Sequence, residues 1–166
     1  GQPLESVTVL GKDVNINFDS RVSAADRLAA SRRVSQAAGL INVNADRLTD
    51  DEKKAIMKIK KFSVVGPGSY IGATSSGMTL EVHRIKNVSI AYLASLFGHE
   101  GQHHLNAGKY SGSDLWRDEQ SAGRTQLGIG NKVGFTSAES IFLEEYTLDS
   151  NRDELQRHML NPVRSK

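Results

Sequence analysis

Segments with the two-residue alternation of a half-buried β-strand all lie in the first half of the chain, and the rest reads as helix. Val14, Ile16 and Phe18, for example, alternate with two asparagines, which places the apolar side chains on one face of a strand. The predicted strands cover residues 6–10, 14–18, 62–65, 69–74 and 78–83. The first two and the last two are expected to form hairpins. Strands gathered ahead of a helical half predict an α+β fold, with helices packed on a small, mainly antiparallel sheet.

Capping residues mark where two of the predicted helices begin. Ser23 is placed to cap a helix over residues 23–38, which Gly39 is expected to end. The run from Thr49 to Glu52 matches a capping box and opens a helix that extends to about residue 60. Further helices are predicted over residues 88–106, 113–127, 137–148 and 151–159. Because no linker rich in Pro, Gly or Ser interrupts its 166 residues, the chain is expected to form one domain over 1–166.

Composition excludes several kinds of function. The chain has no cysteine, which rules out thiol catalysis, thiolate metal sites and disulfides. A net charge of only +2 predicts neither a nucleic-acid partner nor binding to a membrane surface. The sequence has no apolar run long enough to predict membrane insertion. Because the chain begins with Gly1 instead of Met, we expect it to be a domain excised from a longer protein.

The segment from His99 to His103, His-Glu-Gly-Gln-His, carries the clearest chemical signal. Residues four apart lie on the same face of a helix, about 6 Å apart along its axis, so the two imidazoles can bind one ion. Zinc accepts neutral imidazole nitrogens, and a catalytic zinc usually has three protein ligands and a water. Glu100 projects beside the two histidines, and it is predicted to accept a proton from the zinc-bound water.

The alternative for this segment is a polar, exposed helix end on which histidines merely cluster. Gly98 and Gly101 argue against it, since a glycine inside a helix costs about 1 kcal/mol relative to alanine. Two such glycines predict that another backbone or a substrate approaches the helix closely.

A third zinc ligand is predicted at Glu119, on the helix over residues 113–127. Glu119 shares an apolar stripe with Leu115 and Ala122, and a buried carboxylate needs a charge partner that an ion would supply. Ala122 and Gly123 are small enough for this helix to approach the histidine helix closely. The alternative is a glutamate at the edge of the stripe, paired with Lys or Arg. The other acids that compete for the role are Asp114, Asp118, Glu139, Glu144 and Glu145.

The sequence is less specific about the residues that would orient the imidazoles or stabilise the oxyanion. Asp118 and Asp114 are the nearest candidates to orient the ligand imidazoles, although either also suits the N-terminus of its helix. The candidates for a second group that stabilises the oxyanion are Tyr110, His104, Arg124, Tyr146 and His158, and the sequence does not choose among them.

His99, Glu100 and His103, followed sixteen residues later by Glu119 in the pattern Glu-x-x-Ala, resemble the signature of the zincin metallopeptidases of the gluzincin type. The resemblance covers residues 88–127. It implies zinc held by the two histidines and Glu119, with Glu100 as the catalytic base. It also implies a sheet whose edge strand binds extended peptide, and the strand over 78–83 stands in the place of that edge.

Two related signatures fit less well. The metzincin pattern requires a Gly and a third His where this chain has Asn106 and Lys109. The version with an aspartate ligand would use Asp114, which lacks that family's surrounding pattern.

The motif and its resemblance predict a zinc-dependent hydrolase that cleaves peptide bonds in a polypeptide or peptide substrate. The chain is also similar in general character to metallopeptidase domains of bacterial secreted toxins and effectors, which implies secretion or delivery and an inhibitory immunity protein. One alternative is a zinc amidase acting on peptidoglycan by the same chemistry. Another is a non-catalytic zincin-like domain for binding or sensing, against which the presence of Glu100 argues.

Overall fold

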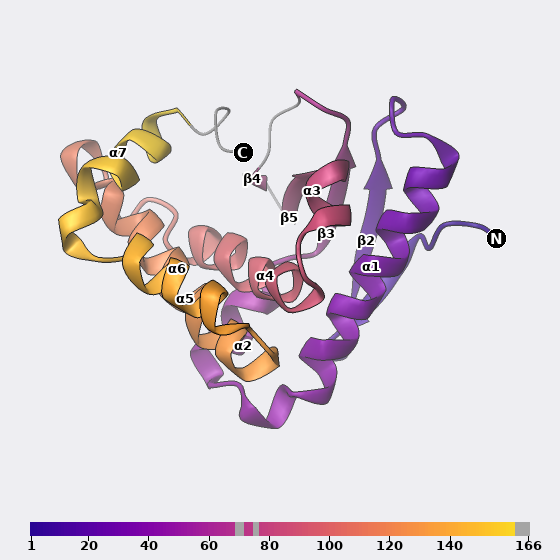
Figure 1. The fold of residues 1–166 in the computed structure, drawn as a ribbon, viewed down its shortest axis with the longest axis horizontal. Helices are drawn as coiled ribbons and strands as arrows, with labels where there is room; N and C mark the ends of the chain where they lie inside the picture. Colours follow the sequence, from indigo (N-terminus) through magenta and orange to yellow (C-terminus); the bar gives the residue numbers. More distant parts are fainter. Residues whose placement is uncertain (69–71, 75–76, 162–166) are drawn as a thin grey trace.

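The computed structural model describes residues 1–68, 72–74 and 77–161, and it shows an α+β fold (Figure 1). The strands are β1 (Ser6–Val9), β2 (Lys12–Phe18), β3 (Lys61–Val65), β4 (Gly72–Thr74) and β5 (Gly77–Glu81). The helices are α1 (Ala24–Val43), α2 (Asp50–Met57), α3 (Val82–Asn87), α4 (Ile90–Leu105), α5 (Trp116–Val133), α6 (Ser137–Tyr146) and α7 (Arg152–Leu160). Among the described residues, none of these helices has both the length and the apolar character needed to cross a bilayer.

The strands form one mixed sheet in the order β1-β2-β3-β5-β4. Both predicted hairpins are present as antiparallel pairs, β1 with β2 and β4 with β5, although the turn expected at Ser75 and Ser76 lies outside the described residues. The expectation of a mainly antiparallel sheet is wrong, because β2, β3 and β5 run parallel. The chain passes through α1 and α2 between β2 and β3, and such a helical crossover returns it to run in the same direction.

The expected edge strand over residues 78–83 also needs correction. β5 lies between β3 and β4, so β4, and not β5, forms this edge of the sheet, with β1 at the opposite edge. β5 ends at Glu81, whose carboxylate accepts hydrogen bonds from the backbone N–H groups of His83 and Arg84 (3.1 and 3.3 Å) and so caps α3. A short helix therefore replaces the last residues of the predicted strand.

The core lies between the sheet and the helices α1 and α4 (Figure 1). Val14 and Ile16 of β2 are buried while the asparagines between them are exposed, which confirms the predicted alternation. Phe62 of β3 and Phe97 of α4 meet in this core with ring centroids 5.6 Å apart. The helices α5, α6 and α7 lie on the other side of α4 from the sheet, so α4 is central to the molecule (Figure 1).

Helix α1 begins as predicted but ends later. The Ser23 hydroxyl accepts a hydrogen bond from the backbone N–H of Asp26, which confirms the cap. Gly39 does not end the helix, which continues to Val43. The extra turn buries Ile41 completely, and the side-chain amide of Asn42 pairs with the backbone of β1 and its turn. These tertiary contacts outweigh the preference of glycine for a helix end.

Helix α2 has the predicted capping box and a close contact with α4. Thr49 and Glu52 exchange both hydrogen bonds of the box (2.8 and 3.1 Å), although the helix ends at Met57 and not near residue 60. A Cβ atom at Gly101 of α4 would lie only 1.7 Å from the carbonyl oxygen of Ala55. The backbones of α2 and α4 thus meet at Gly101, which confirms the close approach expected from the sequence.

Alanine substitutions at two helical glycines are therefore expected to have opposite effects. Gly39→Ala, which meets no atom within 4 Å, is expected to raise the free energy of unfolding by about 0.5–1 kcal/mol. Gly101→Ala is expected to lower it by about 1–3 kcal/mol or more, because the helices must separate. Denaturant unfolding of the two variants measures this, and equal effects would contradict the packing of α2 against α4.

Candidate metal centre

The two histidines of the motif lie one turn apart on α4, with their imidazoles directed at each other. Ser89 caps the helix by accepting a hydrogen bond from the backbone N–H of Tyr92 (3.0 Å). From there the apolar side of α4 packs into the core. This packing fixes how α4 is rotated about its own axis, and therefore which way the motif residues face. The Nε2 atoms of His99 and His103 lie 3.3 Å apart.

Glu119 of α5 completes a compact group of three atoms. Its Oε1 atom lies 3.1 Å from Nε2 of His99 and 2.9 Å from Nε2 of His103. Ligands at 2.0–2.1 Å from a tetrahedral zinc ion lie about 3.3 Å from one another. The three atoms therefore fit a single zinc ion, and two imidazoles with one carboxylate form a donor set typical of catalytic zinc.

Glu100 lies beside this group. Its Oε2 atom is 4.0 Å from Nε2 of His99, and the side chain is largely buried. Ligand atoms of His99, Glu100 and His103 all lie within 4.8 Å of one another, so Glu100 could also reach an ion. Because Oε1 of Glu119 lies nearer to both histidines than Glu100 does, the distances favour Glu119 over Glu100 as the third ligand.

The charges of the three groups depend strongly on one another. Burial lowers the pKa of His103, but its hydrogen bonds to Asp118 and Glu119 outweigh burial and hold that pKa well above its usual value. Burial likewise lowers the pKa of His99, and the carboxylates of Glu119 and Glu100 raise it overall. Burial raises the pKa of Glu119, yet the two histidines hold it well below its ordinary range. In the absence of metal, Glu119 and the two histidines therefore favour one another's charged forms, and zinc would compete with protons for the imidazoles.

Outer hydrogen bonds orient each imidazole so that Nε2 faces the centre. The carbonyl oxygen of Gln126 accepts from Nδ1 of His99 (2.8 Å), and the amide nitrogen of Gln126 donates to the Ser95 hydroxyl (3.1 Å). Asp118 accepts from Nδ1 of His103 and from the side-chain amide of Asn106, both at 2.9 Å. With Nδ1 of each ring occupied, only Nε2 is left for a metal, as is usual for metal-binding histidines.

The structure brings one of the two predicted supporting acids to the histidines. Asp118 contacts His103, whereas Asp114 is exposed and pairs with Arg117 at 3.5 Å. Gln126 was not predicted, although it lies seven residues after Glu119 and so occupies the same face of α5 two turns later. This spacing, and the presence of a polar residue on the buried face of the helix, are the sequence features that could have identified Gln126.

The second carboxylate oxygen of Glu119 has its own partners. Tyr146 of α6 donates its hydroxyl to Oε2 at 2.7 Å, and Nε2 of His158 on α7 lies 3.3 Å from the same atom. Burial, followed by the nearby Glu119, raises the pKa of Tyr146, which keeps its hydroxyl protonated. Two of the five oxyanion candidates are thus brought to the site.

The other three candidates lie elsewhere. His104 lies 2.7 Å from the Gly77 carbonyl oxygen and so links α4 to β5. Arg124 contacts the carbonyl of Thr147 and the carboxylate of Asp149. Tyr110 lies beneath the ammonium group of Lys109.

Small residues bring these helices together, but not all in the expected way. A Cβ atom at Gly98 would lie 2.1 Å from Cδ1 of Ile129, so α4 and α5 touch there. Ala122 is completely buried. Gly123, expected to face α4, instead leaves room for Thr147, whose Cγ2 atom would lie 2.5 Å from an added Cβ. Gly123 therefore lets the end of α6 approach α5, which brings Tyr146 to Glu119.

Asp118→Asn is expected to weaken zinc binding by about 10–100-fold, because the amide is a poorer partner for Nδ1 of His103. Asp114→Asn is the matched control, since this exposed acid lies four residues earlier and is expected to change zinc affinity little. Competition with a chromophoric chelator measures both. Equal affinities would show that Asp118 does not orient His103.

No protein-family model, curated protein or solved structure matches this chain. Its function must therefore be inferred from the residues of the site.

Proposed function

We propose that this protein is a zinc-dependent hydrolase that cleaves peptide bonds. One observation carries the proposal: the donor atoms of His99, His103 and Glu119 lie 2.9–3.3 Å apart, next to the buried carboxylate of Glu100. Three ligands beside a carboxylate suit a catalytic zinc better than a structural one, which is usually closed by four ligands and needs no base.

The zinc ligands and Glu100 would have different roles in hydrolysis. A zinc ion held there would lower the pKa of a bound water and polarise the substrate carbonyl. Glu100 accepts the proton of the attacking water and passes it to the leaving amine. Its burial and its 4.0 Å distance from the nearest imidazole nitrogen suit a group that contacts the water and not the ion.

Tyr146 and His158 support the reaction from the side of Glu119. Their contacts with Oε2 hold the carboxylate so that Oε1 is directed at the two histidines. Tyr146 donates its hydroxyl to Oε2 and so stabilises the negative charge of the Glu119 carboxylate.

A polypeptide substrate suits the edge of the sheet. β4 is an edge strand that contacts α4, so an extended peptide that paired with it would pass close to the motif helix. The contact between His104 and the Gly77 carbonyl fixes β5, the partner of β4, against α4. A secreted toxin or effector setting, with an inhibitory partner, rests on the sequence resemblance alone.

Cleavage assays on the zinc-loaded protein test the proposal. We expect cleavage of a fluorescence-quenched peptide library, its loss with 1,10-phenanthroline, and its recovery when zinc is restored. Cleavage of purified peptidoglycan fragments, with none of peptides, would indicate the amidase alternative. Zinc binding without cleavage of either substrate would indicate a binding or sensor domain and contradict the proposal.

A further inference from the structure

The outer side of α6 is apolar and acidic. Ile141 and Phe142, together with Leu148 just after the helix, are 52%, 55% and 52% exposed. The carboxylates of Glu144 and Glu145 are also exposed, and within the described part of the chain they form no hydrogen bond or ion pair. Large apolar side chains that gather at a surface usually mark a place where another molecule binds. These five residues are called the α6 surface below.

The α6 surface is continuous with the candidate metal centre. Glu139, Phe142 and Tyr146 are spaced to share one face of α6. At one end of this face, Glu139 accepts a hydrogen bond from Ser89 at the start of α4 (2.6 Å). At the other end, Tyr146 donates to Glu119 (2.7 Å).

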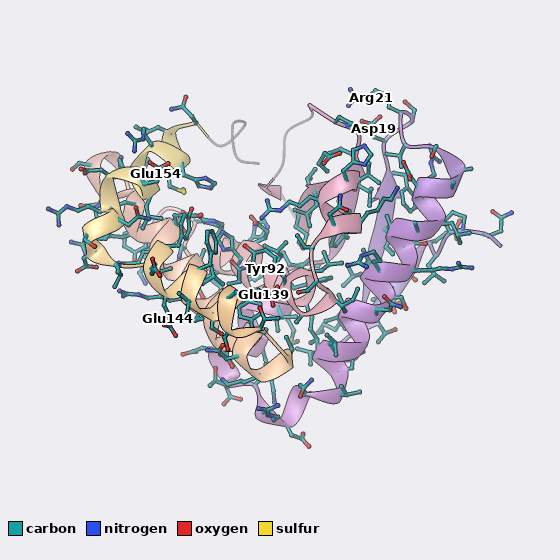
Figure 2. The ribbon with its side chains drawn as sticks, in the orientation of Figure 1. Asp19, Arg21, Tyr92, Glu139, Glu144 and Glu154 are labelled. Carbon is teal, nitrogen blue, oxygen red and sulfur yellow. The ribbon has the colours of Figure 1, made fainter. Side chains whose placement is uncertain are left out.

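Phe142 lies between these two contacts and adjoins the metal centre. Its ring stacks on that of Tyr146, with centroids 5.8 Å apart and planes 12° apart. Figure 2 shows Glu139 on the side of α6 nearer α4, and Glu144 toward the periphery of the molecule. The α6 surface therefore extends from the ring of Phe142, which stacks on Tyr146, to the carboxylate of Glu144 at the periphery of the molecule.

We infer that the α6 surface binds a segment of the polypeptide substrate that combines large apolar residues with Lys or Arg. This inference rests on the proposed function and adds a substrate class to it. The exposed ring of Phe142 favours apolar side chains, and the exposed carboxylates of Glu144 and Glu145 favour basic ones. Continuity with Tyr146 places the bound segment next to the site of cleavage.

The charges also argue against a second copy of the chain as the occupant. A twofold contact would bring the same patch of both subunits together. Glu144 and Glu145 of one copy would then approach those of the other, and like charges at an interface oppose association.

Binding of defined peptides to the Glu100→Gln variant of the 166-residue chain tests the inference without cleavage of the probe. The probe is a short fluorescent peptide of leucine and lysine, and its twin has glutamate in place of each lysine. Phe142→Ala is expected to weaken binding of the lysine peptide about tenfold, as for a central apolar residue of an interface. The double variant Glu144→Lys, Glu145→Lys is expected to reverse the preference in favour of the glutamate peptide. Val43→Ala and Glu5→Lys, at exposed positions outside the α6 surface, are the matched controls.

Three results would overturn the inference. The first is equal affinity of the α6 variants and the controls for the lysine peptide. The second is a dimer that Phe142→Ala dissociates, since a second copy would then occupy the surface. The third is a combination of results: the Glu100→Gln protein binds the probes as expected, but the wild-type protein cleaves no peptide. The bound segment would then not be a substrate. Cleavage of peptides without binding at α6 would refute the inference alone and leave the proposed function intact.

Discussion

Glu100→Gln is expected to lower kcat/KM for peptide cleavage by about 10²–10⁴-fold, to the point where activity is barely detectable. The amide has nearly the same shape as the carboxylate but cannot accept the proton of the attacking water. Under the proposal that Glu119 and not Glu100 is the third ligand, zinc content and melting temperature are expected to stay close to those of the wild type. Steady-state kinetics on a zinc-loaded protein, with zinc measured on the same sample, provides the test.

Zinc content is the informative control for Glu100. Loss of zinc in the Glu100→Gln protein would mean that Glu100 is a ligand, a role that its position within 4.8 Å of both histidines would permit. Unchanged cleavage would mean that another group accepts the proton.

Glu119→Ala is expected to weaken zinc binding by at least about 100-fold, more than the loss of an outer hydrogen-bond partner does. The variant removes one of the three donor atoms and leaves the two buried imidazoles without their shared carboxylate. Glu119→Gln keeps the shape of the side chain and is expected to lose zinc affinity as well, which separates loss of the ligand from loss of packing. Isothermal titration with zinc, alongside unfolding curves, measures both effects.

Two other acids are matched controls for Glu119. Asp114 is exposed, and Glu139 belongs to the capping box of α6 with Thr136, so neither faces the histidines. Asp114→Ala and Glu139→Ala are expected to bind zinc as the wild type does, although loss of the cap lowers stability by about 1 kcal/mol. If Glu119→Ala stayed within a few-fold of wild-type affinity, the gluzincin type of site would have to be abandoned.

The sequence predicted those features that depend on neighbours along the chain. Caps at Ser23 and Thr49 and the alternation around Ile16 follow from local chemistry, and all three are confirmed. The approach of Glu119 to the two histidines followed from its place on a buried stripe, because a buried carboxylate needs a partner of opposite charge.

The remaining features depend on contacts between segments distant in sequence. Alternation shows which face of a strand is buried, but not which strand lies beside it, so the parallel pairing of β2 with β3 was missed. Gly39 has the local preference of a helix end, and only the burial of Ile41 shows why α1 continues. Tyr146 and His158 reach Glu119 through the packing of α6 and α7 on α5, which no pattern within either helix indicates.

The central claim is that His99, His103 and Glu119 hold one zinc ion, and zinc titration of the metal-free protein tests it most directly. The account predicts about one zinc per chain at micromolar or lower free metal, with proton release on binding, because the histidines that bind it have raised pKa values. It also predicts that His99→Ala abolishes this binding under the same conditions. A wild-type protein that binds no zinc at micromolar free metal, or a His99→Ala protein that binds it as tightly as wild type, would contradict the account.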